Sequence, residues 1–388
     1  MRAILERVRE GGDEAVLELA ERFEGRRPSR VAVPEAEWRA AASSAPAEVR
    51  EALAAAADRV RRYHEHQRDP GFSYEEGGIR LGQRVRPLAA VGVYAPGGKA
   101  RYPSSVLMSA IPAAVAGVPR IVLATPRPTP EVLAAAELSG VTEVIDAGGA
   151  QAIGALAYGT STVARVDKIV GPGNIYVACA KRLVFGLVDI DGIAGPSEIL
   201  VVADDEADPE VVAADLLSQA EHDEDAYALL VTLSRAQAER VRAAVERQLA
   251  TLPRRAVAEA SLRAHAACFV AGDLDEAARV ADRLAAEHLA LAVGEPEALF
   301  DRIGAAGAVF LGAFTPEAAG DYAAGPSHVL PTGGAARFTS PLGVYDFVVR
   351  TSIIRYEREA IRAQADLLEA LARLEGLEAH ARAVAIRR

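Results

Sequence analysis

From residue 88 onward, short runs of β-branched residues alternate with alanine-rich amphipathic segments, and no other feature of the sequence constrains the fold as strongly. A strand, a helix and a strand at this spacing predict a parallel α/β unit. One series of strand-like runs lies between residues 89 and 174, and a second lies between residues 227 and 312. We therefore expect the α/β class, with two similar domains built on parallel sheets, although no residue-level repeat relates them.

Helix-like segments flank this region on both sides. Helices are expected at residues 1–24, 35–43, 47–67, near 357–374 and across the last segment, "GLEAHARAVAIRR". A β-like run, "DFVVRTSIIRYE", precedes the two C-terminal helices. Between the second α/β series and this run, residues 320–343 are rich in glycine and proline, and a loop of that length in a compact protein is usually functional.

Charge and hydropathy narrow the class of protein. The chain has 388 residues, enough for about two or three domains, and 43 lysines and arginines against 54 aspartates and glutamates give a net charge of −11. This acidic balance argues against nucleic acid as the main partner and mildly favours a cationic small molecule as the ligand. A role in keeping the protein soluble explains the charge at least as well. The N-terminal segment is an amphipathic helix rather than a signal peptide. The most apolar run, residues 107–119, is too short to span a membrane. We expect a cytoplasmic enzyme.

The two cysteines, Cys179 and Cys268, are too few for a disulfide framework or a thiolate zinc site. Each lies in an apolar stretch, so we expect both to be buried and without a role. The ligands of any bound metal would therefore be histidine, carboxylate or amide groups.

Three of the expected strands end in glycine-rich loops, at residues 94–105, 146–154 and 171–174. Parallel α/β sheets bind ligands beyond the carboxyl ends of their strands. Glycines there allow close backbone approach to a phosphate or cofactor. None of the loops has the G-x-G-x-x-G pattern of a dinucleotide fold. A single loop of this kind is more often a turn, but three at one edge favour a binding site.

Of the seven histidines, His64 and His66 are spaced as i and i+2. Such residues point in different directions on a helix, so we expect a solvated face there. His265 has no polar partner nearby in sequence. The other four lie beside acidic or polar residues: His222, His288, His328 and His380.

Two of these histidines form pairs with a nearby polar residue that could have a role in metal binding or catalysis. Gln219 and His222 are three residues apart and share one helix face, which is compatible with ordinary packing or with half of a metal site. The adjacent Glu287 and His288 could supply two proton acceptors of different basicity, as a reaction with two proton removals needs. Surface charge is the alternative explanation for the Glu287–His288 pair.

Eight segments, in this order, resemble histidinol dehydrogenases. They are "YAPGGKARYPSSVLM", "DAGGAQAIGALAYGT", "VDKIVGPGNIYV", "IDGIAGPSEILVVAD", "DLLSQAEHD", "AAEHLALAV", "GDYAAGPSHVLPT" and "EGLEAHARAV". The resemblance implies two incomplete Rossmann-like domains with N-terminal helices and a C-terminal helical tail. It also implies oxidation of L-histidinol through L-histidinal to L-histidine, the last two steps of histidine biosynthesis, with NAD+ as the hydride acceptor.

The resemblance further implies a role for individual residues. A Zn2+ ion in each subunit would be bound by Gln219, His222, Asp321 and His380, and would hold the substrate. His288 would take the alcohol proton, and Glu287 would activate water in the second step. Substrate would contact the metal ligands and His288 together with Ser197, His328 and Glu375. The cofactor positions are Tyr94, Gln151 and Asn174.

For the domains, the resemblance implies a division into three parts. Residues 1–92 and 201–340 would form the domain with the metal and acid–base residues, residues 93–200 the NAD-binding domain, and residues 341–388 a dimerisation tail. We expect a homodimer with shared active sites, in which His380 comes from the other chain. Family members usually carry some tens of residues before the helix that begins here at Arg2, so we expect an effect on dimer stability.

Two other functions remain open. A paralogue on the same scaffold could oxidise a different small alcohol, but Ser197, His328 and Glu375 favour histidinol. A non-catalytic or hydrolytic zinc protein is a third possibility. The Glu287–His288 pair, together with three cofactor loops, argues against it.

Overall fold

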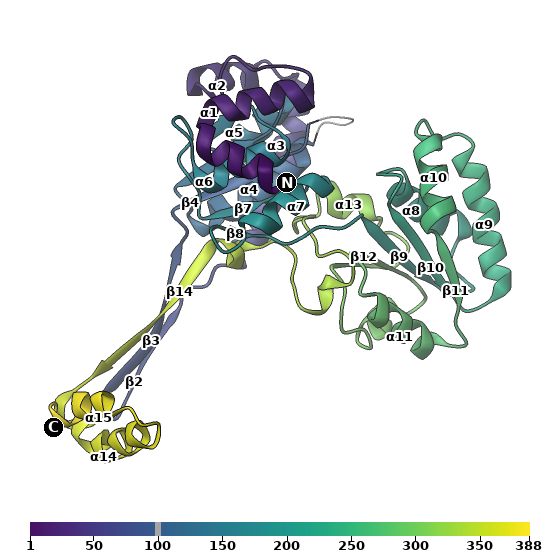
Figure 1. Cartoon of the computed structure of the whole chain (residues 1–388). Helices are drawn as coiled ribbons and strands as arrows, with labels where there is room; N and C mark the ends of the chain where they lie inside the picture. Colours follow the sequence, from purple (N-terminus) through teal and green to yellow (C-terminus); the bar gives the residue numbers. More distant parts are fainter. Residues whose placement is uncertain (98–101) are drawn as a thin grey trace. The chain divides into compact units, whose positions relative to one another are not determined.

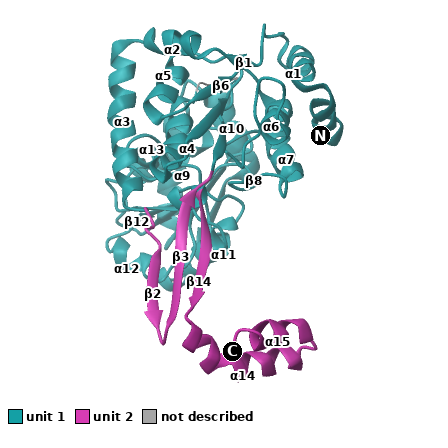
Figure 2. Cartoon of the chain, turned by 90° about the vertical axis from the view of Figure 1, so that its left-hand side faces the viewer, with its two compact units in different colours: residues 1–67, 89–347 teal, residues 68–88, 348–388 magenta. Residues whose placement is uncertain are grey.

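The computed structural model describes residues 1–97 and 102–388. The chain divides into two compact units, one of residues 1–67 and 89–347 and the other of residues 68–88 and 348–388 (Figure 2). The mixed α/β class expected from the sequence is confirmed, with parallel sheets, N-terminal helices and C-terminal helices. Within the described ranges, every helix is too short or too polar to cross a membrane.

The first sheet of the larger unit has six strands (Figure 1). Their order is β1 (Ala32–Val33), β6 (Glu143–Ile145), β5 (Arg120–Ala124), β4 (Ala90–Tyr94), β7 (Lys168–Val170) and β8 (Asp189–Ile190). All neighbours are parallel except β1, which pairs antiparallel with β6. Parallel strands end at one edge of a sheet, so the glycine-rich loops at the ends of β4, β6 and β7 share that edge, as expected. Residues 98–101 of the first loop lie outside the described residues.

Helices α4 (Pro103–Ala116), α5 (Pro130–Ser139), α6 (Gly149–Tyr158) and α7 (Ile175–Val184) connect these strands. Helices α4 and α5 begin with proline and end at a glycine in the left-handed conformation, Gly117 and Gly140 respectively. Proline tolerates the first helical position and glycine adopts the left-handed C-cap at little cost. Local sequence therefore sets both ends of these helices.

The N-terminal helices pack on this first sheet's helices. They are α1 (Arg2–Glu24), α2 (Glu35–Ser43) and α3 (Ala47–Glu65), at the expected positions. Helix α1 contacts α6, and α2 and α3 contact α5 and α4. A Cβ at Gly154 would lie 3.1 Å from Cβ of Val8, so the glycine allows α1 and α6 to approach closely. Residues 2–65 thus pack on the helices of the first sheet, and the expected domain boundaries stay a prediction.

The second sheet of this unit has five parallel strands (Figure 1). Their order is β11 (Ala267–Val270), β10 (Tyr227–Thr232), β9 (Glu198–Ala203), β12 (His288–Ala292) and β13 (Ala308–Leu311). The connecting helices are α8 (Pro209–Ala220), α9 (Arg235–Leu249), α10 (Arg255–His265), α11 (Leu274–Leu284) and α12 (Pro296–Phe300). In β9, Ile199 and Val201 join one core, whereas Leu200 and Val202 join the core on the opposite face. A strand buried on both faces explains the continuous apolar run "ILVVA".

Beyond β13, the glycine- and proline-rich segment forms short elements only. They are α13 (Glu317–Tyr322) and the 3₁₀ turns at Ala335–Arg337 and Val344–Phe347. Helix α13 packs against α8. Ser327 and the Val344–Phe347 turn contact α4 of the first sheet instead, so the segment contacts helices of both sheets, and α13 can contribute side chains to a site near α8.

The smaller unit is built on a three-stranded antiparallel sheet. Its strands are β2 (Phe72–Glu76), β3 (Ile79–Pro87) and β14 (Val348–Tyr356), followed by α14 (Arg358–Leu374) and α15 (Glu378–Ala385). The β2–β3 hairpin was not expected from the sequence, since β2 is exposed and rich in charge. Its turn, Gly77–Gly78, has φ values of 56° and 75°. Two adjacent glycines with positive φ are the usual signal of a tight hairpin.

Two expectations about burial are wrong. Both cysteines are exposed, Cys179 on α7 and Cys268 on β11. Strand β11 is at the edge of its sheet and all its residues are exposed, so an apolar sequence there did not imply burial. His64 is fully buried rather than solvated, with Nδ1 2.8 Å from the carbonyl oxygen of Val60. His66 is exposed, as expected.

Candidate active site

A cluster of imidazoles and carboxyl groups lies where β9 and β12 begin, covered by α13. Glu198 is the first residue of β9 and His288 the first of β12, and the two strands pair in parallel. The cluster is therefore at the amino ends of the second sheet. This differs from the first sheet, whose glycine-rich loops lie at the carboxyl ends.

His288 is 4% exposed and its ring has a defined orientation. Nδ1 lies 3.0 Å from the backbone carbonyl oxygen of Glu198. A carbonyl oxygen only accepts hydrogen bonds, so Nδ1 carries the hydrogen and Nε2 keeps its lone pair. Burial lowers the pKa of His288 to about 4, which keeps the ring neutral near pH 7. A neutral imidazole with a free Nε2 is a competent proton acceptor.

Glu287 and Glu198 exchange hydrogen bonds across the two strands. The Glu287 Oε2 accepts from the backbone N–H of Glu198 at 2.9 Å, and the Glu198 Oε2 accepts from the N–H of Glu287 at 3.4 Å. The other Glu198 oxygen accepts from the N–H of Gly333 at 2.8 Å. Burial, with smaller contributions from Glu198 and Asp321, raises the pKa of Glu287 to about 8. Sequence reasoning missed Glu198, whose only signal is an acidic residue heading an apolar strand.

Asp321 and His328 come from α13 and the loop after it. The Asp321 Oδ1 lies 4.0 Å from Nε2 of His288 and 3.8 Å from Nδ1 of His328. The His328 ring contacts the backbone oxygen of Asp321 through Nδ1 at 3.0 Å, and Oγ of Ser105 through Nε2 at 3.2 Å. Burial lowers the pKa of His328. The structure thus brings together His288, Asp321 and His328, which were predicted from two separate motifs.

Gln219 and His222 lie at the C-terminal end of α8, His222 just beyond the last helical residue. His222 is close enough to His288 and His328 for its positive form to lower the pKa of both. Gln219 is fully buried, and neither its Oε1 nor its Nε2 has a hydrogen-bond partner among the described residues. A buried amide without partners costs about 1–3 kcal/mol. Such an amide is suited to a ligand that the protein does not itself supply.

These residues fit a zinc ion in their donor chemistry. Amide and carboxylate oxygens and imidazole nitrogens are ligands that Zn2+ accepts, and the unpartnered Oε1 of Gln219 would gain a partner from it. No three His, Cys, Asp or Glu side chains converge closely enough, in residues 1–97 and 102–388, to hold a metal by themselves. A zinc site here would therefore need a ligand beyond this set, such as the Gln219 amide or a residue of a second chain.

Glu317, a second residue that the sequence reasoning missed, is the first residue of α13 and is 2% exposed. Its Oε1 lies 3.4 Å from Nδ1 of His288, and its Oε2 lies 3.2 Å from Oγ of Ser218. Burial is the main reason that the pKa of Glu317 is raised to about 9. Its only sequence signal is its position one helical turn before Asp321.

Comparison with known proteins identifies the family. A model of the histidinol dehydrogenase family matches residues 1–388. The chain belongs to this family. A histidinol dehydrogenase of Aquifex aeolicus is 53% identical over 390 residues, which cover 100% of this chain and 92% of the relative. One of Dechloromonas aromatica is 53% identical over 392 residues, covering 99% and 90% respectively.

A solved structure supports the same assignment. The crystal structure of histidinol dehydrogenase from Elizabethkingia anophelis matches with a TM-score of 0.95 and 37% identity, covering 99% of this chain and 90% of that one. The predicted membership of the histidinol dehydrogenase family is confirmed. The chain is thus a dehydrogenase, and its family belongs to histidine biosynthesis.

The three cofactor positions predicted from the family resemblance lie at the carboxyl edge of the first sheet, and each has a contact within the chain. The Tyr94 hydroxyl accepts from the N–H of Gly149 at 3.1 Å, and Gln151 Nε2 donates to Glu24 at 3.2 Å. Asn174 is exposed and caps α7. Tyr94 and Gln151 are buried. The role of all three toward NAD+ stays a prediction.

Three of the predicted histidinol dehydrogenase residues remain. Ser197 directly precedes β9 and is half-buried. Glu375, at the end of α14, and His380, on α15, are exposed and belong to the smaller unit. Their roles also stay predictions.

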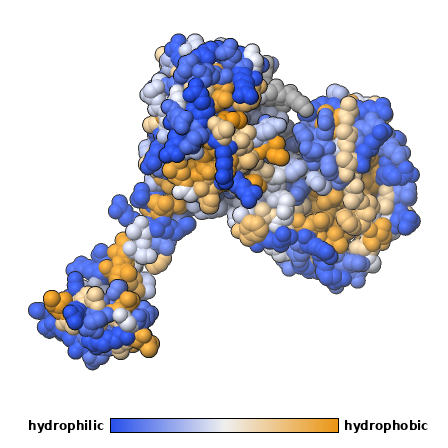
Figure 3. Space-filling model, viewed as in Figure 1, coloured by the Kyte–Doolittle hydropathy of each residue, from blue (hydrophilic) through white to orange (hydrophobic). Residues whose placement is uncertain are grey.

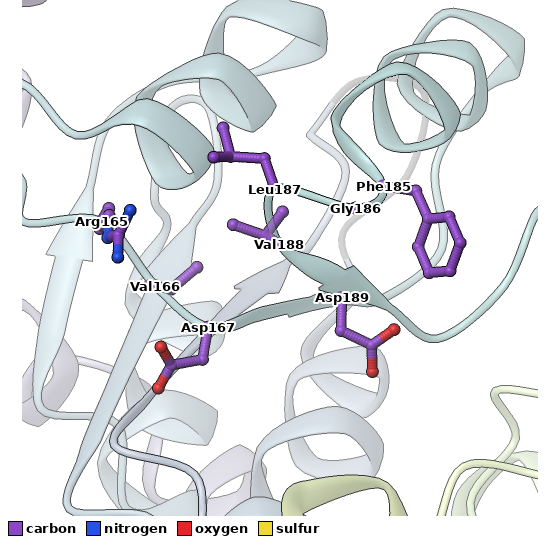
Figure 4. A pocket seen from close by; sticks show the side chains of 8 residues that line it. All are labelled: Arg165, Val166, Asp167, Phe185, Gly186, Leu187, Val188 and Asp189. Carbon is purple, nitrogen blue, oxygen red and sulfur yellow. The ribbon is translucent and has the colours of Figure 1, made fainter. Parts of the chain in front are cut away.

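A pocket of about 240 Å³ lies at the amino ends of β7 and β8 (Figure 4). Phe185, Asp167 and Asp189 are among its lining residues, and none of the predicted site residues lines it. It is separate from the cluster around His288.

Proposed function

We propose that this member of the family oxidises L-histidinol through L-histidinal to L-histidine, with NAD+ as the hydride acceptor at both steps and Zn2+ as the metal. The observation that carries the proposal is the state of His288. Its imidazole is buried and neutral, and its Nδ1–H is directed at the Glu198 carbonyl oxygen, so Nε2 is free. The unpartnered amide of Gln219 supports a metal nearby.

In the first step, Nε2 of His288 would accept the proton of the substrate alcohol as the hydride leaves. The Nδ1–H would stay bonded to the Glu198 carbonyl, which stabilises the positive imidazolium that forms. Gln219, His222 and Asp321, with His380 of a second chain, would hold a Zn2+ ion that binds the substrate. Tyr94, Gln151 and Asn174 would hold the NAD+ that accepts the hydride.

In the second step, Glu287 would take a proton from the water that attacks the aldehyde. Its carboxyl has a pKa of about 8 because it is buried among other acids. Positive charge in the site lowers the pKa of a carboxyl group, so substrate and metal together favour the ionised form that a base needs. The Glu198 N–H holds one oxygen of Glu287 in place for this role.

We further propose a homodimer with shared sites, in which Glu375 and His380 complete the site of the partner. The buried residues of α14 and α15 are few: Ala360, Ala365, Glu369 and Ala381. Apolar side chains remain exposed on these helices and the segments beside them (Figure 3), among them Leu367, Leu371, Leu374, Leu377 and Ile386. Helices with so small a core need tertiary packing, which a second copy would supply. The cytoplasm is the proposed compartment.

One assay tests the proposal. Purified, zinc-loaded protein is mixed with L-histidinol and NAD+, and NADH and histidine are measured. Formation of both, in a ratio that accounts for two oxidations, is the expected result. NADH formation with another small alcohol but not with histidinol would indicate a paralogue. No turnover with any alcohol would favour a zinc protein of another class.

A further inference from the structure

Glu317 is the most unusual buried side chain near His288. It is 2% exposed, and its Oε1 has no hydrogen-bond partner that meets normal geometry in the described parts of the chain. The same oxygen lies 3.4 Å from Nδ1 of His288, whereas the nearest Glu287 oxygen is 3.7 Å from that nitrogen. Nδ1–H therefore has the Glu198 carbonyl oxygen as its acceptor at 3.0 Å, with the Glu317 carboxyl close beside it.

The fold gains little from this carboxyl group. Ser218, which contacts its Oε2, also donates to the backbone oxygen of Asp215 at 2.8 Å. His288 keeps the Glu198 carbonyl as partner whether or not Glu317 is present. Removal of Glu317 would thus leave both Ser218 and His288 with a hydrogen-bond partner. Burial of Glu317 costs free energy, because its Oε1 is removed from water without gaining a hydrogen bond. A residue that costs stability beside a reacting group points to a role in function.

We propose that Glu317 is a positioning residue for His288, which it holds and polarises through Nδ1 while Nε2 takes the substrate proton. As Nε2 gains the proton, Nδ1–H becomes a stronger donor. The contact at 3.4 Å is long for the neutral ring and shortens readily when the ring is charged. An interaction that is stronger in the transition state than in the ground state raises kcat and leaves KM nearly unchanged.

The inference rests on the proposed function, so the experiment begins with the wild-type oxidation of histidinol. The test variant is Glu317→Leu, which keeps the volume and removes the acceptor. Glu317→Gln keeps an acceptor oxygen and is the conservative variant. Glu297→Leu is the matched control, because Glu297 is an exposed glutamate in the first turn of another short helix, α12.

We expect Glu317→Leu to lower kcat by about ten-fold to a hundred-fold with KM nearly unchanged. Glu317→Gln should recover most of kcat, and the control should match wild type. The thermal midpoint of Glu317→Leu should equal or exceed that of wild type. In NMR spectra, the imidazole N–H resonance that is lost in His288→Asn should shift in Glu317→Leu.

Several outcomes would overturn the inference. They are a full kcat in Glu317→Leu, no recovery in Glu317→Gln, or a loss of kcat that only follows a lowered thermal midpoint. If Glu317→Leu does not fold, Ser218→Ala is the deciding variant, because it removes the hydroxyl that contacts Oε2 of Glu317. A several-fold lower kcat in Ser218→Ala supports the role of Glu317. An unchanged kcat overturns it. A wild-type enzyme that does not oxidise histidinol contradicts the proposed function instead. An active wild type with fully active Glu317 variants contradicts only the role of Glu317.

Discussion

Nδ1 of His288 lies 3.0 Å from the backbone carbonyl oxygen of Glu198, and this contact determines which imidazole nitrogen is free for chemistry. The two residues are far apart in the sequence and meet because β9 and β12 are neighbouring parallel strands. A backbone acceptor cannot be removed by a side-chain substitution. The sheet therefore fixes one partner of Nδ1, whatever side chains surround the ring.

His288→Asn should nearly abolish histidinol oxidation, because the alcohol proton loses its acceptor. Loss of a general base typically costs about 10²–10⁴-fold in rate. Steady-state NADH formation measures the effect, and the thermal midpoint shows whether the variant is folded. Near-normal turnover by a folded variant would contradict the assignment of His288 as the base.

Glu287→Gln should impair the oxidation of histidinal more than that of histidinol. The amide oxygen can still accept from the Glu198 N–H, now at 2.9 Å from Oε2, so the local structure is kept while the base is lost. The two half-reactions are measured separately, with histidinol and with histidinal supplied as substrates. An equal loss of rate in both half-reactions would show that Glu287 is not, as proposed, specific to the second step.

Gln219→Leu should weaken zinc binding without destabilising the metal-free fold, because the amide has no partner to lose. Gln237 is the matched control: it is also fully buried, but it donates to the Ala207 carbonyl at 2.7 Å and accepts from Arg240 at 2.8 Å. Gln237→Leu should therefore cost about 1–3 kcal/mol. Zinc content after dialysis and the free energy of unfolding in chelator measure the two effects. A large destabilisation by Gln219→Leu would indicate a structural role.

The buried His64 should make the protein less stable in mild acid. Burial lowers its pKa below the value of about 6.5 of an unfolded chain. The unfolded state therefore binds a proton first, and stability falls as the pH drops below about 6.5 towards the folded-state pKa. Between pH 7.5 and 5.5, the free energy of unfolding of His64→Leu should fall less than that of wild type, as measured by urea titration. The contribution of one histidine is at most about 1.4 kcal/mol per pH unit. His66→Leu, at an exposed position, should keep the wild-type dependence.

Shared sites can be tested by co-expression of two inactive variants, His380→Ala and His288→Asn. If His380 serves the partner's site, the mixed dimer has one site with both lesions and one with neither. Activity should then return in the heterodimer, isolated by two different affinity tags. Heterodimers as inactive as their parents would show that His380 acts within its own chain.

Much of the fold was predictable because its signals are local. The alternation of apolar runs and amphipathic segments at residues 89–174 and 227–312 depends only on residues that are close in sequence. The strands are therefore predictable without knowledge of the strands with which they pair. Proline at the start of α4 and α5, and glycine after their ends, act within one helical turn. The Gly77–Gly78 turn carried an equally local signal, but the charged, exposed strands around it obscured the hairpin.

Sequence motifs alone, read through a family resemblance, also singled out Gln219, Glu287, His288, Asp321 and His328. Only the tertiary structure decided that Nε2 of His288 is the free nitrogen, that Glu198 and Glu317 face its Nδ1, and that Cys268 is exposed on an edge strand. The physical reason is that burial and hydrogen bonding depend on which distant segments meet. A residue type specifies what a side chain can do, and its packing determines which of those possibilities is realised.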